Sequence, residues 1–493
     1  WQHTGYNAWK SLFTPVRRPL PDMRDDRCHK MTYQLMDPVS IIIVFRNEQL
    51  SMLLRLLHSL KERTDPELFG ELILVNDHSQ DAFWQEESSK EAFLQYVLFN
   101  ISPYACIFHL QDQIGVVRAR KFAMNEAKRD YLVFLDALME VTDGWLEPLL
   151  GIICLNPTTV VTPQLDDLDD ISLEYVRRVE RRGLFDWTLR RREVPLMREQ
   201  LLMLPQPYEM PVMRTAAFAV HANFYRHLMG IIDLELSAPQ VVELELSLMV
   251  WRFDGKLLQV PCSHVGHLQP SDHRYLQRYG SVAQMGEQYF KSLRRLVDFW
   301  LDEPKYQELA YEYQPQLLDT SSYNVSDNNT LNRDLLFHNF SWYLQHIAPD
   351  LLLHFPLKPR ADLATGLLRS NKLRDLCLTG DWEFGLVTLE PCGKGANDSQ
   401  NWTLTSMNDL RLSVSYCAQV ENNNSVVLQL CHAHSGNQHW ELNLDYSYMS
   451  SNMLCLAFDT VDTRQVVEVD DCDPRVSSQR WLFDQVNVES FKS

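Results

Sequence analysis

Apolar and polar positions alternate in the first part of the chain with two different periods. Residues 40–45 form an apolar run that is typical of a strand buried on both faces, and residues 72–75, 106–110 and 131–135 predict three further strands. Two segments between them have apolar side chains at helical spacing: residues 52–60 and 117–127. Strands that alternate with helices in this way predict an α/β domain built on a mostly parallel sheet.

Polar side chains follow two of the predicted strands. Asn76 and Asp77 come directly after one apolar run, and Asp136 comes directly after another. Ligands of parallel α/β sheets bind at the carboxyl ends of the strands. We therefore expect Asp136 to lie where a ligand or a metal is held.

The last quarter of the chain has a different pattern, a repeat of about 40 residues. Each copy holds a pair of cysteines followed by a Gln-x-Trp triplet, and the three tryptophans are Trp402, Trp440 and Trp481. The cysteine pairs are Cys377–Cys392, Cys417–Cys431 and Cys455–Cys472. A unit this short cannot form a core alone, whereas three units around a common axis can, with one disulfide in each lobe. The repeat predicts an all-β, three-lobed domain; the alternative is a coincidence of three similar spacings.

Composition narrows the possible functions. The 493 residues carry a formal net charge of −19, which disfavours binding to nucleic acid. The longest apolar runs, residues 41–45 and 149–155, are shorter than the ~20 residues of a membrane helix. Paired cysteines and several Asn-x-Ser/Thr sequons favour a secretory protein. The chain starts at Trp1, so we expect any signal or anchor segment to precede it.

Several motifs resemble one enzyme family, the polypeptide N-acetylgalactosaminyltransferases. They are Ser-Ile-Ile-Ile-Val-Phe-Arg-Asn-Glu at 40–48, Arg-Ala-Arg at 118–120, Phe-Leu-Asp at 134–136, Gly-Trp-Leu-Glu-Pro-Leu-Leu at 144–150 and Pro-Cys-Ser-His-Val-Gly-His at 261–267. The resemblance implies a GT-A-type catalytic domain followed by a ricin B-type β-trefoil lectin domain. It also implies transfer of GalNAc from UDP-GalNAc to Ser or Thr of mucin-type proteins with Mn²⁺. Golgi location and a type II membrane anchor before Trp1 are further implications.

The resemblance also suggests domain boundaries and one more disulfide. We expect an N-terminal segment at 1–36 that packs on a glycosyltransferase-like domain at 37–310. A linker with a helical connection at 311–365 leads to the lectin domain at 366–488. The family pattern pairs Cys28 with Cys262, and leaves Cys106 and Cys154 either joined to each other or as buried free thiols.

The metal and nucleotide positions implied by the family are only partly filled. The three metal positions are Asp136, Leu138 and His267, and leucine has no lone pair to offer a metal. The nucleotide-binding candidates are Asn76, Asp77, Arg118 and Asp136. The alternative interpretation is that Asp136 and His267 persist as ordinary strand-end and loop residues without a metal.

The donor-sugar loop departs furthest from the family. Its Trp-Gly-Gly-Glu-Asn motif corresponds to residues 239–243, which include Pro239, Val242 and Glu243, and no position matches. We therefore expect a divergent pseudoenzyme that binds glycans or proteins. The alternative is an active retaining transferase with weak or altered dependence on Mn²⁺.

The lectin positions leave a similar choice. Family lobes bind sugar through an Asp two residues after the first cysteine, and here that position holds Thr379, Gln419 and Ala457. The middle lobe keeps most of the remaining pattern, so its candidate residues for binding GalNAc-glycopeptides are His432, Asn437, Gln438 and Trp440. The alternative is a trefoil kept only as a structural module.

Overall fold

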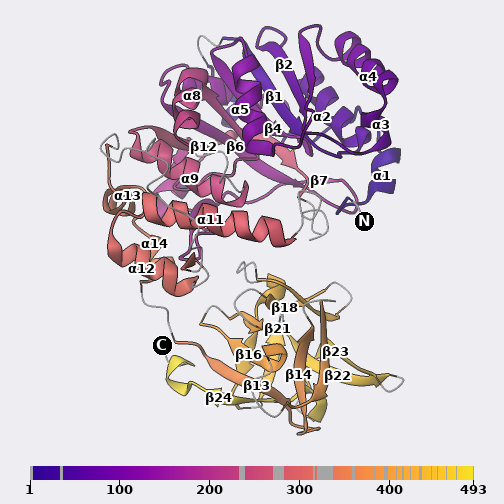
Figure 1. Cartoon of the computed structure of the whole chain (residues 1–493), viewed down its shortest axis with the longest axis vertical. Helices are drawn as coiled ribbons and strands as arrows, with labels where there is room; N and C mark the ends of the chain where they lie inside the picture. The colour runs from indigo at the N-terminus through magenta and orange to yellow at the C-terminus, as the bar shows by residue number, and fades with distance from the viewer. Residues whose placement is uncertain are drawn as a thin grey trace. The chain divides into compact units, whose positions relative to one another are not determined.

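The computed structural model divides into two compact units, residues 1–351 and 352–493 (Figure 1). The structure describes residues 4–33, 37–232, 239–269, 282–314, 317–318, 337–357, 361–381, 385–393, 398–406, 408–412, 416–421, 424–431, 436–445, 447–451, 453–461, 464–473 and 475–491. No helix within these ranges is long and apolar enough to cross a membrane.

The first unit is built on a ten-stranded mixed sheet with the order β10-β12-β6-β11-β4-β1-β2-β3 along its main path. Its strands are β1 (Val39–Phe45), β2 (Phe69–Asn76), β3 (Ala105–His109), β4 (Tyr131–Asp136), β5 (Met139–Val141), β6 (Thr159–Leu168), β7 (Tyr175–Val176), β10 (Tyr208–Glu209), β11 (Ala217–His221) and β12 (Lys256–His267). Neighbours β4, β1, β2 and β3 are parallel, as are β6 and β12. The predicted mostly parallel sheet is confirmed, with β11 inserted antiparallel between β4 and β6.

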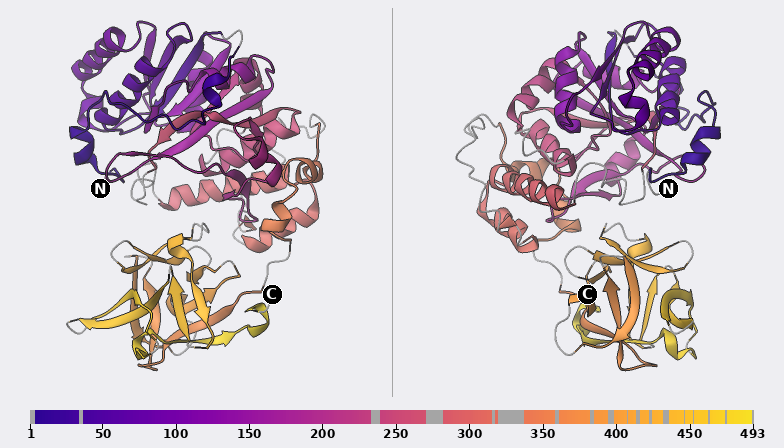
Figure 2. Two further views of the ribbon diagram at one scale, coloured as in Figure 1. Left: turned by 180° about the vertical axis from the view of Figure 1, so that it is seen from behind. Right: turned by 45° about the vertical axis from the view of Figure 1, so that its right-hand side comes forward.

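Helices cover both faces of this sheet (Figures 1 and 2). The helices of the sheet region are α1 (Ala8–Phe13), α2 (Leu50–Arg63), α3 (Ala82–Gln85), α4 (Glu87–Asn100), α5 (Val116–Glu126), α6 (Glu147–Ile153), α7 (Arg198–Met203) and α8 (Ala222–Ile231). One hydrophobic core joins alternate residues of β1, β2 and β4 to α2, α4 and α6. On the opposite face Phe134 of β4 stacks on Phe218 of β11 and contacts Tyr225 of α8. Burial on both faces explains why residues 41–45 of β1 are all apolar.

A hairpin and a set of helices complete the first unit. A two-stranded hairpin joins β8 (Arg182–Phe185) to β9 (Arg191–Val194). Further helices are α9 (Pro239–Arg252), α11 (Val282–Trp300), α12 (Pro304–Tyr313), α13 (Phe340–His346) and, at the border of the units, α14 (Leu351–His354). A buried ion pair between Glu245 and Arg295 fastens α9 to α11, and the indole of Trp300 donates to the same carboxylate at 3.0 Å.

Cysteine chemistry differs between the two units. The first unit has one disulfide, Cys28–Cys262, which ties the N-terminal segment to β12. Cys106 and Cys154 are free, with Cys106 exposed and Cys154 half-buried. Of the two sequence-based alternatives, free thiols are therefore confirmed and a mutual disulfide is wrong, but neither thiol is fully buried as expected. Cys106 lies on β3, the edge strand of the main path, where one face stays open to water.

The second unit is the predicted all-β domain. Its strands are β13 (Ala364–Ser370), β14 (Leu376–Asp381), β15 (Leu386–Pro391), β16 (Asn401–Leu404), β17 (Leu410–Leu412), β18 (Tyr416–Val420), β19 (Val426–Leu430), β20 (Glu441–Asn443), β21 (Tyr448–Ser451), β22 (Leu454–Val461), β23 (Arg464–Asp471) and β24 (Trp481–Val486). Strand β24 pairs with β13, which joins the end of the domain to its beginning. Disulfides close each lobe: Cys377–Cys392, Cys417–Cys431 and Cys455–Cys472.

The three tryptophans of the repeat make the same contact in each lobe. Trp402, Trp440 and Trp481 are at most 1% exposed and belong to one hydrophobic core. Each indole nitrogen donates at 2.8 Å to the carbonyl of the residue after the first cysteine of its lobe, respectively Leu378, Ala418 and Leu456. The repeat is therefore a structural unit, with a buried indole whose polar end is satisfied.

Candidate functional site

Asp136 ends β4 at the carboxyl edge of the sheet, as its position after an apolar run predicts. Its Oδ1 accepts a hydrogen bond from Nη2 of Arg120 at 2.9 Å, and the Arg120 guanidinium lies over the rings of Phe134 and Phe218. Burial raises the pKa of Asp136 to about 6, although Arg120 favours the charged form. The carboxylate is thus already paired with a cation that belongs to the protein.

His267 ends β12 and lies beside Asp136. Its Nε2 is 3.7 Å from Oδ2 of Asp136, and its buried Nδ1 has no hydrogen-bond partner within the described ranges. Burial lowers the pKa of His267 to about 3, and the positive charges of Arg214 and Arg178 act in the same direction. The imidazole is therefore neutral at physiological pH.

Leu138, at the middle metal position, is a core residue. It is 4% exposed and packs in a small hydrophobic cluster with, among others, Tyr6, Met52 and Leu268. Nowhere in the described residues do three or more His, Cys, Asp or Glu side chains come together as a metal site does. Asp136 and His267 alone offer two ligands, one of them bound to Arg120, and this set does not fit a Mn²⁺ centre.

The two candidate nucleotide ligands after β2 are occupied by backbone contacts. Asp77 accepts from the backbone nitrogens of Ile114 and Gly115 at 2.8 and 2.9 Å, which fixes the start of α5. Asn76 accepts from the backbone nitrogen of Ser79 at 3.0 Å. Arg118 is half-buried on α5, two residues before Arg120, so the two side chains leave the helix on different sides. The structure brings these residues to one edge of the sheet, and their roles toward a nucleotide stay predictions.

The donor-loop positions form the first turns of α9 instead of a glycine-rich loop. Pro239 is the first residue of this helix, and Val242 is buried at 5% exposure. Glu243 accepts a hydrogen bond from the backbone nitrogen of Thr215 at 3.0 Å. Val242 thus stands at the position of the family's loop acid, and the neighbouring Glu243 uses one carboxylate oxygen to hold the segment before β11.

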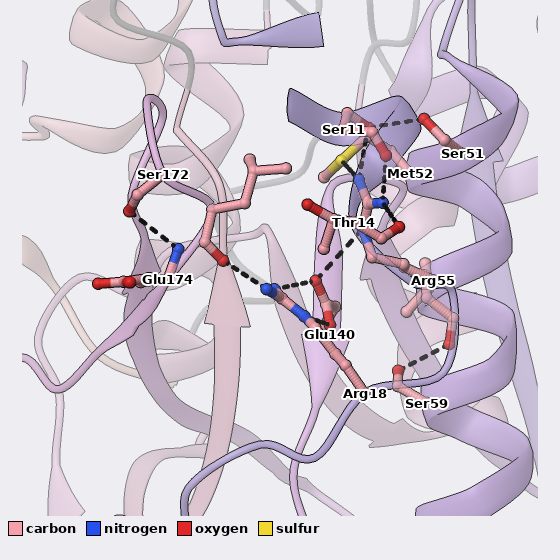
Figure 3. Close-up of polar contacts among 12 residues, drawn as sticks. Ser11, Thr14, Arg18, Ser51, Met52, Arg55, Ser59, Glu140, Ser172 and Glu174 are labelled. Carbon is pink, nitrogen blue, oxygen red and sulfur yellow. Dashed lines mark hydrogen bonds and ion pairs between the residues drawn. The ribbon is translucent and has the colours of Figure 1, made fainter. Parts of the chain in front are cut away.

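A buried ion network supports the segment that carries Asp136 and Leu138 (Figure 3). Glu140, 2% exposed, accepts from Nε of Arg18 at 2.8 Å and lies 3.6 Å from Nε of Arg55. Arg55 is fully buried and donates to the carbonyl oxygens of Ser11 and Thr14 at 2.8 and 3.2 Å. One carboxylate thus joins the N-terminal segment, α2 and β5.

Sequence reasoning missed a cluster of arginines around Glu193. Oε1 of Glu193 accepts from Arg214 at 2.5 Å and from Arg191 at 3.1 Å, and Oε2 accepts from Arg178 at 3.3 Å. Burial opposes ionisation of Glu193, but the three arginines outweigh it and hold its pKa at about 2. The basic runs at 177–178 and 190–192 were the available signal, and their convergence required the β8–β9 hairpin.

This low pKa predicts a specific pH dependence of stability. The usual pKa of Glu is 4.5, so the ionised carboxylate stabilises the fold fully above about pH 4.5, and this contribution is lost as the pH falls toward 2. Glutamine resembles the protonated acid, so we expect Glu193→Gln to lower the free energy of unfolding by about 3 kcal/mol at pH 7. Urea unfolding at pH 7, 4.5 and 3 should show that the difference in the free energy of unfolding between the parent and Glu193→Gln becomes smaller as the pH falls. The control is Glu199→Gln, on the exposed start of α7, which should show no such trend. A difference for Glu193→Gln that stays the same at all three pH values would contradict the prediction.

The middle lobe of the lectin domain holds a chain of polar side chains. Gln438 is fully buried and donates to Oε1 of Gln419 at 3.0 Å, and Gln419 donates to Oε1 of Glu421 at 2.8 Å. Asn437 is exposed beside them, whereas the candidate His432 lies outside the described residues. Trp440 is part of the core, so it supports this lobe from inside. Glu421 therefore brings a carboxylate next to the position of the family's Asp.

Comparison with known proteins agrees with this architecture. A family model described as glycosyl transferase family 2 matches residues 40–223, and a model of the ricin-type beta-trefoil lectin domain matches residues 364–481. Fold and site together define a glycosyltransferase-type domain followed by a lectin domain.

Two relatives and one solved structure cover most of the chain. "Putative inactive polypeptide N-acetylgalactosaminyltransferase 12" of Drosophila melanogaster is 43% identical, over 88% of this chain and 77% of that protein. Polypeptide N-acetylgalactosaminyltransferase 8 of Drosophila melanogaster is 33% identical, over 99% of this chain and 83% of that protein. The crystal structure of GalNAc-T7 with UDP, GalNAc and Mn²⁺ matches with a TM-score of 0.66 at 25% identity, over 98% of this chain and 88% of that one. The chain belongs to the polypeptide N-acetylgalactosaminyltransferase family.

Proposed function

We propose that this chain is a pseudoenzyme of its family, which binds glycans or proteins and does not transfer GalNAc. The observation that carries the proposal is the state of the metal position: Leu138 is packed in a hydrophobic cluster, and Asp136 is paired with Arg120. Departure of UDP needs positive charge at the diphosphate, which Mn²⁺ supplies when it is bound. With two residual ligands, the chain retains the fold of the transferases without their metal centre.

The donor-sugar positions support the same proposal. Val242, at the position of the family's loop acid, is buried in α9 and has no polar atom to offer a sugar hydroxyl, and Glu243 uses one of its oxygens to bind the backbone of Thr215. Loss of an electrostatic contact to the transition state costs about two to three orders of magnitude in rate. Loss of the metal and of the sugar carboxylate together is therefore enough to abolish turnover.

The lectin domain carries the proposed binding role. GalNAc-glycopeptides are the ligand we assign to the middle lobe, through Asn437, Gln438 and the neighbouring Glu421. From its family membership we propose that the chain acts in the Golgi lumen or the secretory pathway, as part of a type II membrane protein. Ser/Thr-rich acceptor proteins and UDP-GalNAc are the partners of an active family member, and here we expect the former to bind without being modified.

A transfer assay tests the proposal directly. We expect that the whole chain, incubated with UDP-GalNAc, Mn²⁺ and a Ser/Thr-rich peptide, forms no more GalNAc-peptide than the same mixture without the protein. Addition of EDTA should leave the melting temperature of the chain unchanged, because the described residues include no cluster of ligands that fits Mn²⁺. Turnover that depends on Mn²⁺ would refute the pseudoenzyme and support the active alternative. Binding to a GalNAc-peptide, compared between the parent and Asn437→Ala, tests the lectin role separately.

A further inference from the structure

A small polar cavity lies beside the arginine cluster of the first unit. Its volume is about 40 Å³, and its lining includes Gln164, Arg178, Arg181, Arg191, Glu193 and Arg214. One buried water needs roughly 10–15 Å³ by a similar measure, so this cavity holds a group of a few heavy atoms and no nucleotide base.

The charge of the lining favours an anion. Four guanidinium groups face one carboxylate, an excess of three positive charges. Three more carboxylates lie near the lining: Asp167, 3.4 Å from Arg178; Glu243, which acts on Arg191; and Asp166, which accepts from the backbone nitrogen of Arg178 at 2.9 Å and is paired with His264. The four guanidinium groups outnumber Glu193 and Asp167, the two carboxylates that form ion pairs with them among the described contacts.

The arginines also keep donors for which the described residues provide no acceptor. A guanidinium has five N–H groups, and among the described contacts Arg214 uses one nitrogen, Nη2, to bind Glu193. Arg191 uses Nη1 toward Glu193 and Nε toward the carbonyl of Val212. Gly183, on the strand that faces Arg191, makes this approach possible, since a Cβ there would lie 2.0 Å from the carbonyl oxygen of Val212 and 2.9 Å from Nε of Arg191. The carboxylate of Glu193 holds the guanidinium groups together and leaves some N–H donors of each group available to a bound anion.

We propose that this cavity binds a phosphoryl group or an equivalent tetrahedral oxyanion without a metal. Guanidinium forks match such oxyanions in geometry and charge, and the pairing is strongest where water is partly excluded. Two sources carry this chemistry, inorganic phosphate and the diphosphate of a nucleotide such as UDP. Only the second source rests on the proposed function, through the family's nucleotide.

Calorimetric titration of the whole chain in EDTA tests the proposal, with inorganic phosphate as the probe. We expect saturable binding by the parent chain and a loss of affinity of at least about tenfold in Arg214→Gln. Arg178→Gln is the second variant, because its guanidinium is the more exposed and its removal disturbs the fold less. The matched control is Arg177→Gln. Arg177 is the residue before Arg178, but its side chain is exposed and paired with Glu180, so this variant removes the same charge outside the cavity.

The outcomes separate this inference from the proposed function. Absence of saturable phosphate binding by the parent, or equal affinity in the parent and in folded Arg214→Gln and Arg178→Gln, overturns the anion site. Displacement of phosphate by UDP in EDTA identifies the nucleotide as a source, and phosphate binding that UDP does not displace identifies the free anion. None of these results depends on transfer activity, which the GalNAc transfer assay measures alone.

Discussion

Replacing Glu140 by Gln should lower the free energy of unfolding by about 3–5 kcal/mol, the cost of leaving a buried charge without its partner. Arg55 is fully buried, and Glu140 is the carboxylate that faces both it and Arg18 (Figure 3). Glutamine keeps the shape of the side chain but removes its charge, so the two guanidinium groups would repel each other. Urea unfolding of the whole chain measures the loss.

Glu174→Gln is the control for this prediction. Glu174 lies in the same region of the structure (Figure 3), and its exposed side chain makes no ion pair among the described contacts. Its replacement should change the free energy of unfolding by less than about 0.5 kcal/mol. Equal stability of the Glu140 and Glu174 variants would show that the Arg18–Glu140–Arg55 network contributes little.

Restoring the missing ligand with Leu138→His should raise the affinity for Mn²⁺ by about tenfold or more over the parent. The new imidazole would stand two residues from Asp136, next to the strand that ends at His267, and so complete a set of three ligands. It would also remove an apolar side chain from the cluster around Tyr6 and Met52, at a cost of about 2 kcal/mol in stability. Calorimetric titration with Mn²⁺ and thermal unfolding measure the two effects.

The matched control introduces the same imidazole elsewhere in the same cluster. Leu173 is 1% exposed and belongs to this cluster, and the described contacts of Asp136 are with Arg120 and His267 and not with Leu173, so Leu173→His should lose stability without gaining affinity for Mn²⁺. A failure of Leu138→His to bind Mn²⁺ better than Leu173→His would mean that pairing with Arg120 has made Asp136 unable to act as a ligand.

The sequence predicted the strands and the two-domain architecture better than the buried polar contacts. The runs at 40–45 and 131–135 identify β1 and β4 because a strand buried on both faces must be apolar throughout. The antiparallel insertion of β11 was not predictable in this way, because an apolar run does not encode the direction of its strand. The family resemblance is confirmed by relatives that cover most of the chain.

Polar contacts between distant segments account for most of what the sequence did not reveal. Arg178, Arg191 and Arg214 are separated by up to 36 positions and converge only because the β8–β9 hairpin folds beside β6. The substitution at Leu138 was visible in the sequence, but its packing with Tyr6 depends on where the N-terminal segment lies. Burial and charge at such places depend on tertiary contacts, which local patterns do not contain.

The indole contacts of the lectin domain separate its framework from its recognition surface. In every lobe the bond from Trp402, Trp440 or Trp481 ends on a main-chain carbonyl, and main-chain atoms are the same for every amino acid. The next residue along, which is Thr379, Gln419 or Ala457, can therefore change its side chain without weakening that bond. Each lobe is free to gain, lose or alter a ligand independently of the other two, and the differences among these three residues are what such independent divergence produces.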